Sequence, residues 1–588
     1  MHEFRLWAPR VHKLQVVLND GERVPMKGPD QKGWWSVSVE QAGCNTDYAY
    51  LVDDDPTPYP DPRSAWQPQG VHAASRVYDQ GAFSWTDANW HCPPLSGAIL
   101  YELHIGTFSK EGTFDGAIQH LDYLVDLGIT HVEVMPINEF AGNRGWGYDG
   151  VFLFAPFEPY GGPDGFKRFV NACHAKNLAV ILDVVYNHFG PVGNYTNKFG
   201  PYLTDRFHTP WGAAVNFNEG GSDEVRRFFC DNAIMWLKDY HVDGLRLDAV
   251  HEYIDRSAVH FMEQLSAEVE RLGATMGRKF VLIAESDLND PKFVRPREAH
   301  GYGMDAQWSD DFHHSLFTLL WSEPGRGYYD DFGSMDDLVK SLKSVFVYDG
   351  GFSGYRQHSH GRPVDGLSAH HFLGYIQNHD QVGNRAAGER VEHLVGMDAA
   401  KVALGLVLTA PFIPMLFMGE EFAASAPFLY FADHEEEEMR RLVSEGRKRD
   451  FAAFGWDEAD VPDPEEPETM ERSKLDWAEI HKGKHHEMLD WVKGLIHLRR
   501  TTLDLNDGDL GHLRVECTPD DRALTMKRGS VRVLANLGSE PVKMRLGEGE
   551  EVRMSSTESI VVSGREIAMP KLSFAVLMPP PEGDGAVQ

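Results

Sequence analysis

The chain has 588 residues, too many for a single hydrophobic core, so roughly two to four domains are expected. Its composition, 42% hydrophobic, 25% charged and 11% aromatic, is that of a globular protein. The formal net charge of −33 argues against nucleic acids and anionic membranes as partners, because the field of the whole protein would repel both, but it is compatible with a neutral substrate.

Several features argue against a membrane, metal or redox protein. Neither CxxC nor CxH spacing occurs among the five cysteines, which favours reduced structural thiols: Cys44, Cys92, Cys173, Cys230 and Cys517. The N-terminal run MHEFRLWAPR has no apolar signal core. Pro411 and Pro414 divide the apolar stretch 402–419 into halves too short to cross a bilayer, so we expect a buried helix, a turn and a buried strand. A cytoplasmic protein is therefore expected.

Residues 1–86 have the pattern of a small all-β domain. Short runs that alternate in polarity or are rich in aromatic residues are separated by Gly, Asp and Pro: FRLWAP, KLQVVLND, WWSVSVE and YAYLVD. The proline-rich stretch 54–72 is expected to be an ordered but irregular crossing. Trp34 and Trp35 could stack on sugar rings, but positions in the core and at a sheet edge are the simpler interpretation.

From residue 98 onward, eight strand-like runs recur, with helical segments between several of them. The runs are AILYELHIGTF (98–108), HVEVMPINEF (131–140), AVILDVVYNH (179–188), GLRLDAVH (244–251), FVLIAESD (280–287), DAQWSDDF (305–312), FLGYIQNHD (372–380) and PMLFMGEEF (414–422). Residues 116–128, 164–177 and 222–241 have apolar residues at helical spacing. Strands that alternate with helices imply parallel pairing, so the sequence predicts an α/β fold, a closed (β/α)8 TIM barrel over 87–510, with 305–312 as its weakest strand.

Two further segments complete the chain. The stretch 434–471 is acidic and interrupted by prolines, which favours a solvated excursion from the barrel over a binding segment. Residues 485–500 have the pattern of the last helix of the barrel. The alternating segments from 511 to 588 predict a C-terminal antiparallel β-domain, a second β-sandwich.

Several of the predicted strands begin apolar and end polar, and the carboxyl ends of parallel barrel strands meet at the rim where active sites lie. Four charged clusters are expected to converge there: Asp183 with Asn187 and His188, Arg246 with Asp248 and His251, Glu285 with Asp287, and His379 with Asp380. The carboxylates of Asp248, Glu285 and Asp380 would repel one another and separate their pKa values. Cleavage of a glycosidic bond needs one ionised and one protonated carboxyl group, although each carboxylate alone could be a salt bridge or a loop cap.

Four short runs carry a resemblance to a known family. DVVYNH (183–188), GLRLDAVH (244–251), IAES (283–286) and QNHD (377–380) resemble, in order, the four signature regions of the α-amylase superfamily of retaining glycoside hydrolases. The resemblance implies that Asp248 is the nucleophile, that Glu285 is the general acid/base and that Asp380 grips sugar hydroxyls near the transition state. It also implies a subsite for the reacting sugar, with Tyr148 as its aromatic platform, lined by Asp183, His188, Arg246 and His379.

The resemblance implies no cofactor and no required metal. Asn187 matches a position that helps bind calcium in many α-amylases, but the rest of that calcium site is not recognisable, so hydrogen bonding is expected instead. The pair of histidines in HSH (358–360) has a metal-like spacing. It stands in a loop that contains Gly and Arg and has no acidic neighbour in sequence, so a solvated loop is favoured over a zinc site.

A narrower resemblance is to the maltooligosyltrehalose trehalohydrolase family of this superfamily. It rests on HFGPVGNY (188–195), HTPWGAAVNF (208–217), AESDLNDPKFV (284–294), QWSDDFHHSL (307–316), QNHDQVGNRAAGER (377–390), GEEFAASAPFLYFADHE (419–435) and TMERSKLDW (469–477). FRLWAP is similar to the start of the N-terminal immunoglobulin-like β-sandwich that this family shares with glycogen-branching enzymes and isoamylases.

The reaction implied is hydrolysis of the α-1,4 bond that joins a maltooligosaccharide to a terminal trehalose, with release of trehalose and net retention. The retaining mechanism predicts that Asp248 and Glu285 lie about 5 Å apart. The substrates implied are maltooligosyltrehalose and related α-glucans, and the functional partner implied is maltooligosyltrehalose synthase.

Selectivity for a trehalose leaving group must come from contacts on the leaving-group side of the scissile bond. We expect residues 286–290, above all Asp287, to form part of that floor. The loop around Trp211 and the pair Asp310–Asp311 are expected to contribute as well, with loop scaffolding as an equal alternative for these three residues.

Two alternatives stay open. A glycogen-branching or debranching-type α-glucan enzyme would have the same fold and nucleophile, and in branching a sugar hydroxyl would replace water as the acceptor. A non-catalytic glycan-binding protein is the more remote alternative, since it would be expected to lack at least one of Asp248, Glu285 and Asp380.

Overall fold

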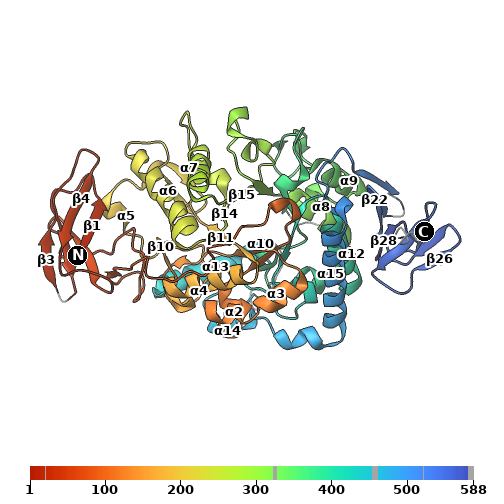
Figure 1. The fold of residues 1–588 in the computed structure, drawn as a ribbon, viewed down its shortest axis with the longest axis horizontal. Helices are drawn as coiled ribbons and strands as arrows, with labels where there is room; N and C mark the ends of the chain where they lie inside the picture. Colours follow the sequence, from red (N-terminus) through yellow and green to blue (C-terminus); the bar gives the residue numbers. More distant parts are fainter. Residues whose placement is uncertain (20, 322–326, 453–460, 519, 521, 581–588) are drawn as a thin grey trace, which may run out of the picture.

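The computed structural model describes residues 1–19, 21–321, 327–452, 461–518, 520 and 522–580. The N-terminal sheets lie at one end of an elongated molecule, a barrel forms the middle, and the C-terminal sheets lie at the other end (Figure 1). Within the described part of the chain, no helix combines the length and the apolar character needed to cross a bilayer.

Eight parallel strands close the barrel in chain order, and they arise from the eight runs predicted from the sequence. They are β7 (Leu100–Leu103), β8 (His131–Val134), β11 (Ala179–Val184), β14 (Gly244–Leu247), β15 (Val281–Ala284), β16 (Ala306–Trp308), β19 (Phe372–Gly374) and β20 (Ile413–Phe417). All of their residues are buried, as expected for parallel strands with the barrel interior on one face and helices on the other. The (β/α)8 prediction is confirmed.

The strand register places polar residues side by side at the carboxyl rim. Asp183 of β11 lies directly opposite Arg246 of β14. Glu102 of β7 lies directly opposite Glu133 of β8. Because partners in register point to the same face of a sheet, each of these pairs shares one side of the barrel wall.

The helices of the barrel region reproduce the predicted helical segments 164–177, 222–241 and 485–500, whereas the predicted segment 116–128 is interrupted. They are α1 (Ile105–Phe108), α2 (Phe114–Ile118), α3 (Leu121–Leu127), α4 (Gly162–Ala175), α5 (Thr196–Phe199), α6 (Ser222–Asp239), α7 (Phe261–Met276), α8 (Asp310–Leu320), α9 (Met335–Ser344), α10 (His379–Gly383), α11 (Val391–Val395), α12 (Met397–Thr409) and α15 (Gly483–Thr501). The segment 116–128, expected as one helix, is divided between α2 and α3. His120 leaves helical geometry, with φ −103° and ψ 2°, and stacks on Trp477 with ring centroids 4.1 Å apart. The apolar stretch 402–419 forms the end of α12, a turn and β20, as expected.

Short antiparallel pairs and two helices decorate the barrel. The pairs are β9 (Asn138–Glu139) with β10 (Phe152–Pro156), β12 (Leu203–Thr209) with β13 (Gly212–Val215), and β17 (Phe352–Ser353) with β18 (His358–Ser359). The acidic stretch 434–471 contributes α13 (Glu437–Ala452) and α14 (Pro467–Arg472), while its residues 453–460 lie outside the described residues. Arg447 of α13 donates to the carbonyl of Gly383 at 2.7 Å, so this helix is tied to the barrel beside α10.

The N-terminal strands form two small antiparallel sheets. One pairs β1 (His2–Trp7) with β4 (Trp34–Val39), and the other has the order β3 (Glu22–Pro25), β2 (Leu14–Leu18), β5 (Asp47–Val52) and β6 (Ser75–Arg76). Trp35 is buried and Trp34 donates to Glu224 of α6 at 3.0 Å, in agreement with the core and edge interpretation. Arg63 joins these sheets to the barrel through Asp231 of α6, at 2.9 Å.

Two antiparallel sheets form the C-terminal end of the molecule. The five-stranded sheet has the order β21 (Arg514–Thr518), β22 (Ala523–Arg528), β23 (Val531–Asn536), β28 (Ser573–Met578) and β25 (Glu551–Ser555). The three-stranded sheet has the order β24 (Val542–Arg545), β27 (Glu566–Met569) and β26 (Val561–Ser563). Phe574 of β28 packs edge-on against Trp491 of α15, with ring centroids 5.9 Å apart, so this end docks on the barrel helices.

Candidate active site

A fully buried guanidinium lies at the centre of the carboxyl rim. Arg246 Nη1 donates to Asp183 Oδ2 and to Asp248 Oδ1, at 2.7 Å each, and its Nη2 lies 3.6 Å from Glu285 Oε2. The guanidinium also lies over the ring of Trp308, 4.3 Å from the centroid. One cation therefore balances carboxylates from three neighbouring strands, which explains how β14 tolerates a buried charge.

Asp248 follows directly after β14 and is held from both sides. Arg246 binds its Oδ1, and the side-chain amide of Asn187 donates to its Oδ2 at 3.0 Å. Asn187 therefore forms a hydrogen bond within the site, as expected from the sequence. The carboxylate of Asp248 has a defined orientation, which a nucleophile needs for attack at a single carbon.

The backbone at Ala249 links Asp248 to Glu285. Ala249 has φ 39° and ψ 53°, a left-handed conformation that is uncommon outside glycine, and its amide donates to Glu285 Oε2 at 2.6 Å. Burial raises the pKa of Glu285 above its ordinary value. A carboxyl group that keeps its proton beside a charged carboxylate is the combination that acid-assisted bond cleavage requires.

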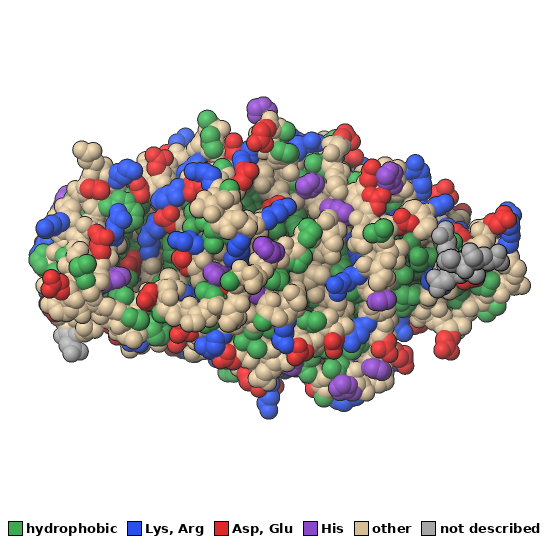
Figure 2. All heavy atoms as spheres, in the orientation of Figure 1, with side chains coloured by type: hydrophobic (Ala, Val, Ile, Leu, Met, Phe, Trp, Pro, Cys, Tyr) green, Lys and Arg blue, Asp and Glu red, His purple; other side chains and the backbone are tan. Residues whose placement is uncertain are grey.

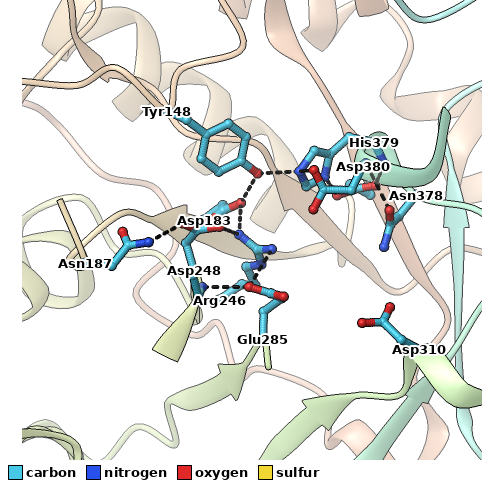
Figure 3. Close-up of polar contacts among 12 residues, drawn as sticks. Tyr148, Asp183, Asn187, Arg246, Asp248, Glu285, Asp310, Asn378, His379 and Asp380 are labelled. Carbon is cyan, nitrogen blue, oxygen red and sulfur yellow. Dashed lines mark hydrogen bonds and ion pairs between the residues drawn. The ribbon is translucent and has the colours of Figure 1, made fainter. Parts of the chain in front are cut away.

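Tyr148 bridges two of the predicted site residues. Its hydroxyl donates to Asp183 Oδ2 at 2.7 Å and lies 2.8 Å from His379 Nε2, and its ring stacks on the imidazole (Figure 3). Burial raises the pKa of Asp183 to about 7.

Asp380 comes from the opposite wall, at the start of α10. Asn378 caps this helix by accepting from the amides of Asp380 and Gln381, at 3.0 and 3.2 Å. The Asp380 carboxylate is half-exposed, with its Oδ1 3.5 Å from His379 Nε2. Asp248, Glu285 and Asp380 therefore surround one space at the rim instead of lying in separate regions of the molecule (Figure 3).

A cleft of about 550 Å³ opens beside these carboxylates. Its lining combines polar and aromatic side chains with one leucine, from five segments of the chain: Glu285, Asp287, Leu288, Trp308, Asp310, His314, Tyr328, Tyr355, Arg356, His358, His360, Asn378, Asp380, Gln381 and Asn384. Polar groups set among aromatic rings suit a ligand that is rich in hydroxyl groups.

The structure separates the three residues that were expected to act together on the leaving-group side. Asp310 lines the cleft, where the hydroxyl of Tyr375 donates to it at 2.7 Å and burial raises its pKa to about 7. Asp311, one position along α8, points away from the cleft. Its Oδ2 accepts from the backbone amides of Val347 and Tyr348, at 2.7 and 3.0 Å. Asp311 therefore has a scaffolding position, which was the equal alternative to a substrate contact, because successive helix residues point in different directions.

Trp211 lies on another side of the site. It stands in the turn between β12 and β13, half-exposed, and stacks on His188 with centroids 4.7 Å apart. It is not among the residues that line the cleft, so the shared floor expected for Trp211 and Asp310 is not observed. Burial raises the pKa of Glu285, and His251, in the turn Val250–Glu252, lies close enough to this carboxyl to offset part of that rise.

Sequence reasoning missed the wall of the cleft that residues 328–360 form. The HSH loop was expected to be solvated, and His358 and Ser359 are exposed, but His360 is buried and lies 2.8 Å from the backbone oxygen of Asp287. Arg356 lies 3.3 Å from the Asp287 carboxylate. The signal available was the density of aromatic, His and Arg side chains in this stretch. No cluster of His, Cys, Asp or Glu suited to a metal ion occurs among the residues described.

Comparisons with known proteins agree with this architecture. The family described as alpha amylase, catalytic domain, matches residues 78–202. The chain is 46% identical to the malto-oligosyltrehalose trehalohydrolase of Rhizobium sp. (strain M-11), over 98% of this chain and 97% of that protein. It is 44% identical to the protein of the same name from Mycobacterium tuberculosis (strain H37Rv), over 98% and 99%. A crystal structure from Salmonella typhimurium, of a protein assigned provisionally to the alpha amylases, is 35% identical with a TM-score of 0.89 and covers 98% and 97% of the two chains.

The scaffolding position of Asp311 and the half-exposed position of Asp287 predict different effects of substitution on stability. Asp311→Ala leaves two backbone amides and the Asn289 amide without their acceptor, so we expect a loss of about 2–4 kcal/mol in the free energy of unfolding and a lower Tm. Asp287→Ala removes a half-exposed carboxylate and serves as the control, with nearly unchanged Tm. Thermal unfolding followed by circular dichroism checks both. An unchanged Tm for Asp311→Ala would contradict its scaffolding role.

Proposed function

The chain belongs to the malto-oligosyltrehalose trehalohydrolase family of α-amylase-type glycoside hydrolases, and on this premise we propose that it releases trehalose from malto-oligosyltrehalose. The observation that carries the proposal is the pairing of Asp248 and Glu285 with one buried guanidinium, beside a polar cleft. This arrangement supports a double displacement with net retention.

In this mechanism Asp248 attacks the anomeric carbon while Glu285 gives its proton to the departing trehalose oxygen. A covalent bond forms between Asp248 and the glycosyl group as the glycosidic bond breaks. Glu285, now ionised, removes a proton from water, and the resulting hydroxide displaces Asp248 from the anomeric carbon. Asp380, on the facing wall, binds hydroxyl groups of the sugar as its ring flattens toward the transition state.

The leaving-group side is the cleft beyond Glu285. Asp287 and Arg356 offer charged groups to hydroxyls, and the exposed ring of Tyr355 offers a face for stacking. A site built to hydrogen-bond the hydroxyls of two α,α-1,1-linked glucose units leaves its own groups unpaired when a plain maltose end binds. This mismatch supports selectivity for a trehalose-ended chain.

The proposed substrate implies a partner reaction. A maltooligosyltrehalose synthase would supply the trehalose-ended chain, so the two enzymes would act in sequence in trehalose formation.

A cytoplasmic location is supported by the cysteines, all five of which are free thiols. Acidic, basic and histidine side chains are interspersed over the face shown in Figure 2, which supports the expectation that no nucleic acid binds.

Product analysis tests the proposed function. Purified protein incubated with maltotetraosyltrehalose should release free trehalose and maltotetraose, which anion-exchange chromatography resolves. Asp248→Asn should lower the rate of trehalose release at least about 1,000-fold, while substrate binding is retained. New branch points in amylose, without release of trehalose, would instead show the branching activity of the alternative. Binding without any turnover would show a glycan-binding protein.

The raised pKa of Glu285 sets the sign of the pH dependence. The first step needs the protonated carboxyl, so kcat/KM should remain high through weakly acidic pH and fall as the pH rises past the pKa of Glu285. Glu285→Gln should lose about 100- to 10,000-fold on the natural substrate. On an α-glycosyl fluoride, which leaves without a proton, the loss in the first step should be much smaller and the fall in activity at the pKa of Glu285 should disappear. A basic limb that stays at its wild-type pH in this variant would contradict the assignment of Glu285, whereas a fall only near pH 9 would reflect His379.

Selectivity can be tested at the acid–base pair of the cleft. For Asp287→Ala we expect the ratio of kcat/KM on maltotetraosyltrehalose to kcat/KM on maltohexaose to fall about tenfold or more. Arg356→Ala should shift the ratio in the same direction, because it removes the partner of Asp287. Asp365→Ala, an exposed aspartate outside the cleft, is the control. An unchanged ratio in Asp287→Ala would remove this residue from the leaving-group site.

A further inference from the structure

Glu102 is a buried carboxylate at the end of β7 that the catalytic scheme does not use. Both of its oxygens bind one residue: Oε1 lies 2.5 Å from His379 Nδ1, and Oε2 accepts the backbone amide of His379 at 2.9 Å. Glu102 therefore holds the side chain and the main chain of His379 together, immediately before Asp380.

The hydrogen bonds account for a proton on each ring nitrogen of His379. Nδ1 faces a carboxylate oxygen, which only accepts, so Nδ1 is the donor. Nε2 faces the hydroxyl of Tyr148 at 2.8 Å, and that hydroxyl gives its own proton to Asp183 Oδ2. The Tyr148 oxygen is thus left to accept from Nε2. An imidazole that donates from both nitrogens carries a positive charge.

We propose that Glu102 is a positioning residue, whose carboxylate keeps His379 doubly protonated and fixes its Nε2–H between Tyr148 and Asp380. The effect on catalysis rests on the proposed function, whereas the protonation state does not. Burial lowers the pKa of His379, but the charges of Glu102 and Asp380 outweigh this and raise the pKa to about 9. The imidazolium would then persist across the neutral range.

Titratable groups on every neighbouring element face His379: Glu102 (β7), His104 (after β7), Glu133 (β8), Tyr148, Asp183 (β11), Arg246 (β14) and Asp380 (α10). Burial lowers the pKa of His104 to about 3 and raises the pKa of Glu133 well above its ordinary value, so burial favours the neutral form of both groups. Arg246 opposes the charge on His379. Glu102 is the buried carboxylate that hydrogen-bonds directly to the ring, so its charge contributes most to the raised pKa of His379.

Glu133 provides a matched control in the same barrel wall. It lies directly opposite Glu102 in the β7–β8 register and is equally buried, with 1% exposure for each residue. Burial favours the neutral form of Glu133, so Glu133→Gln makes the same change of shape with less change of charge, whereas Glu102→Gln removes the charge that faces His379. The two variants therefore separate loss of charge from disturbance of packing.

The direct test follows the protonation of His379. In protein labelled with ¹³Cε1-histidine, the His379 resonance is identified by its absence in His379→Gln and followed from pH 5 to pH 10. It should titrate near pH 9 in the wild type and in Glu133→Gln, and near or below the ordinary value of about 6.5 in Glu102→Gln. An unchanged titration in Glu102→Gln would overturn the proposal, whatever the enzyme hydrolyses.

The catalytic consequence is tested on the substrate that the wild type cleaves. With the pKa of His379 lowered from about 9 to the ordinary value of about 6.5 or below, kcat/KM of Glu102→Gln should fall at least about 30-fold at pH 8 and less than about threefold at pH 5.5. An equal loss at both pH values would show a structural role only and would overturn the positioning role. A failure of trehalose release in the wild type would count against the proposed function and leave the histidine titration as it stands.

Discussion

The site depends on the cost of burying charge. A guanidinium taken out of water is expensive unless carboxylates pair with it, and Arg246 meets this condition through Asp183, Asp248 and Glu285. The same pairing would serve the proposed chemistry, because the one cation holds the proposed nucleophile and the proposed proton donor close together. Stability and reactivity therefore rest on the same contacts, and neither acid could be moved without leaving the arginine underpaired.

Around this core, backbone and helix geometry orient each acid in a different way. The amide of Ala249, in a left-handed conformation, donates to Glu285, so the segment that carries the proposed nucleophile Asp248 also positions the proposed proton donor. Asn378 caps α10 and thereby places Asp380 on the facing wall. The carboxylates thus reach one space from strand ends on one side and from a helix start on the other, which lets the barrel surround the sugar.

How far the sequence predicts the structure differs between strands and loops. The eight strands were predictable because strands buried on both faces are continuous apolar runs, and the acids at their ends were predictable because parallel strands share a rim. The different environments of Asp310 and Asp311 could not be predicted, because the sequence does not show which side of the first turn of α8 faces the cleft. The wall formed by residues 328–360 was missed because its placement depends on tertiary contacts, such as the one between Arg356 and Asp287.

The hairpin of β17 and β18 has an implication for the diversification of such enzymes. It carries Tyr355, Arg356 and His358 into the cleft but contributes no strand to the barrel, and Asp331 anchors it through the amide of Tyr355. In the proposed function, recognition of the departing sugar would therefore depend on a hairpin outside the barrel, while bond cleavage would depend on residues of the barrel itself. Grafting a different hairpin at this position offers a route by which selection, or a protein engineer, can retarget the enzyme without rebuilding its reactive centre.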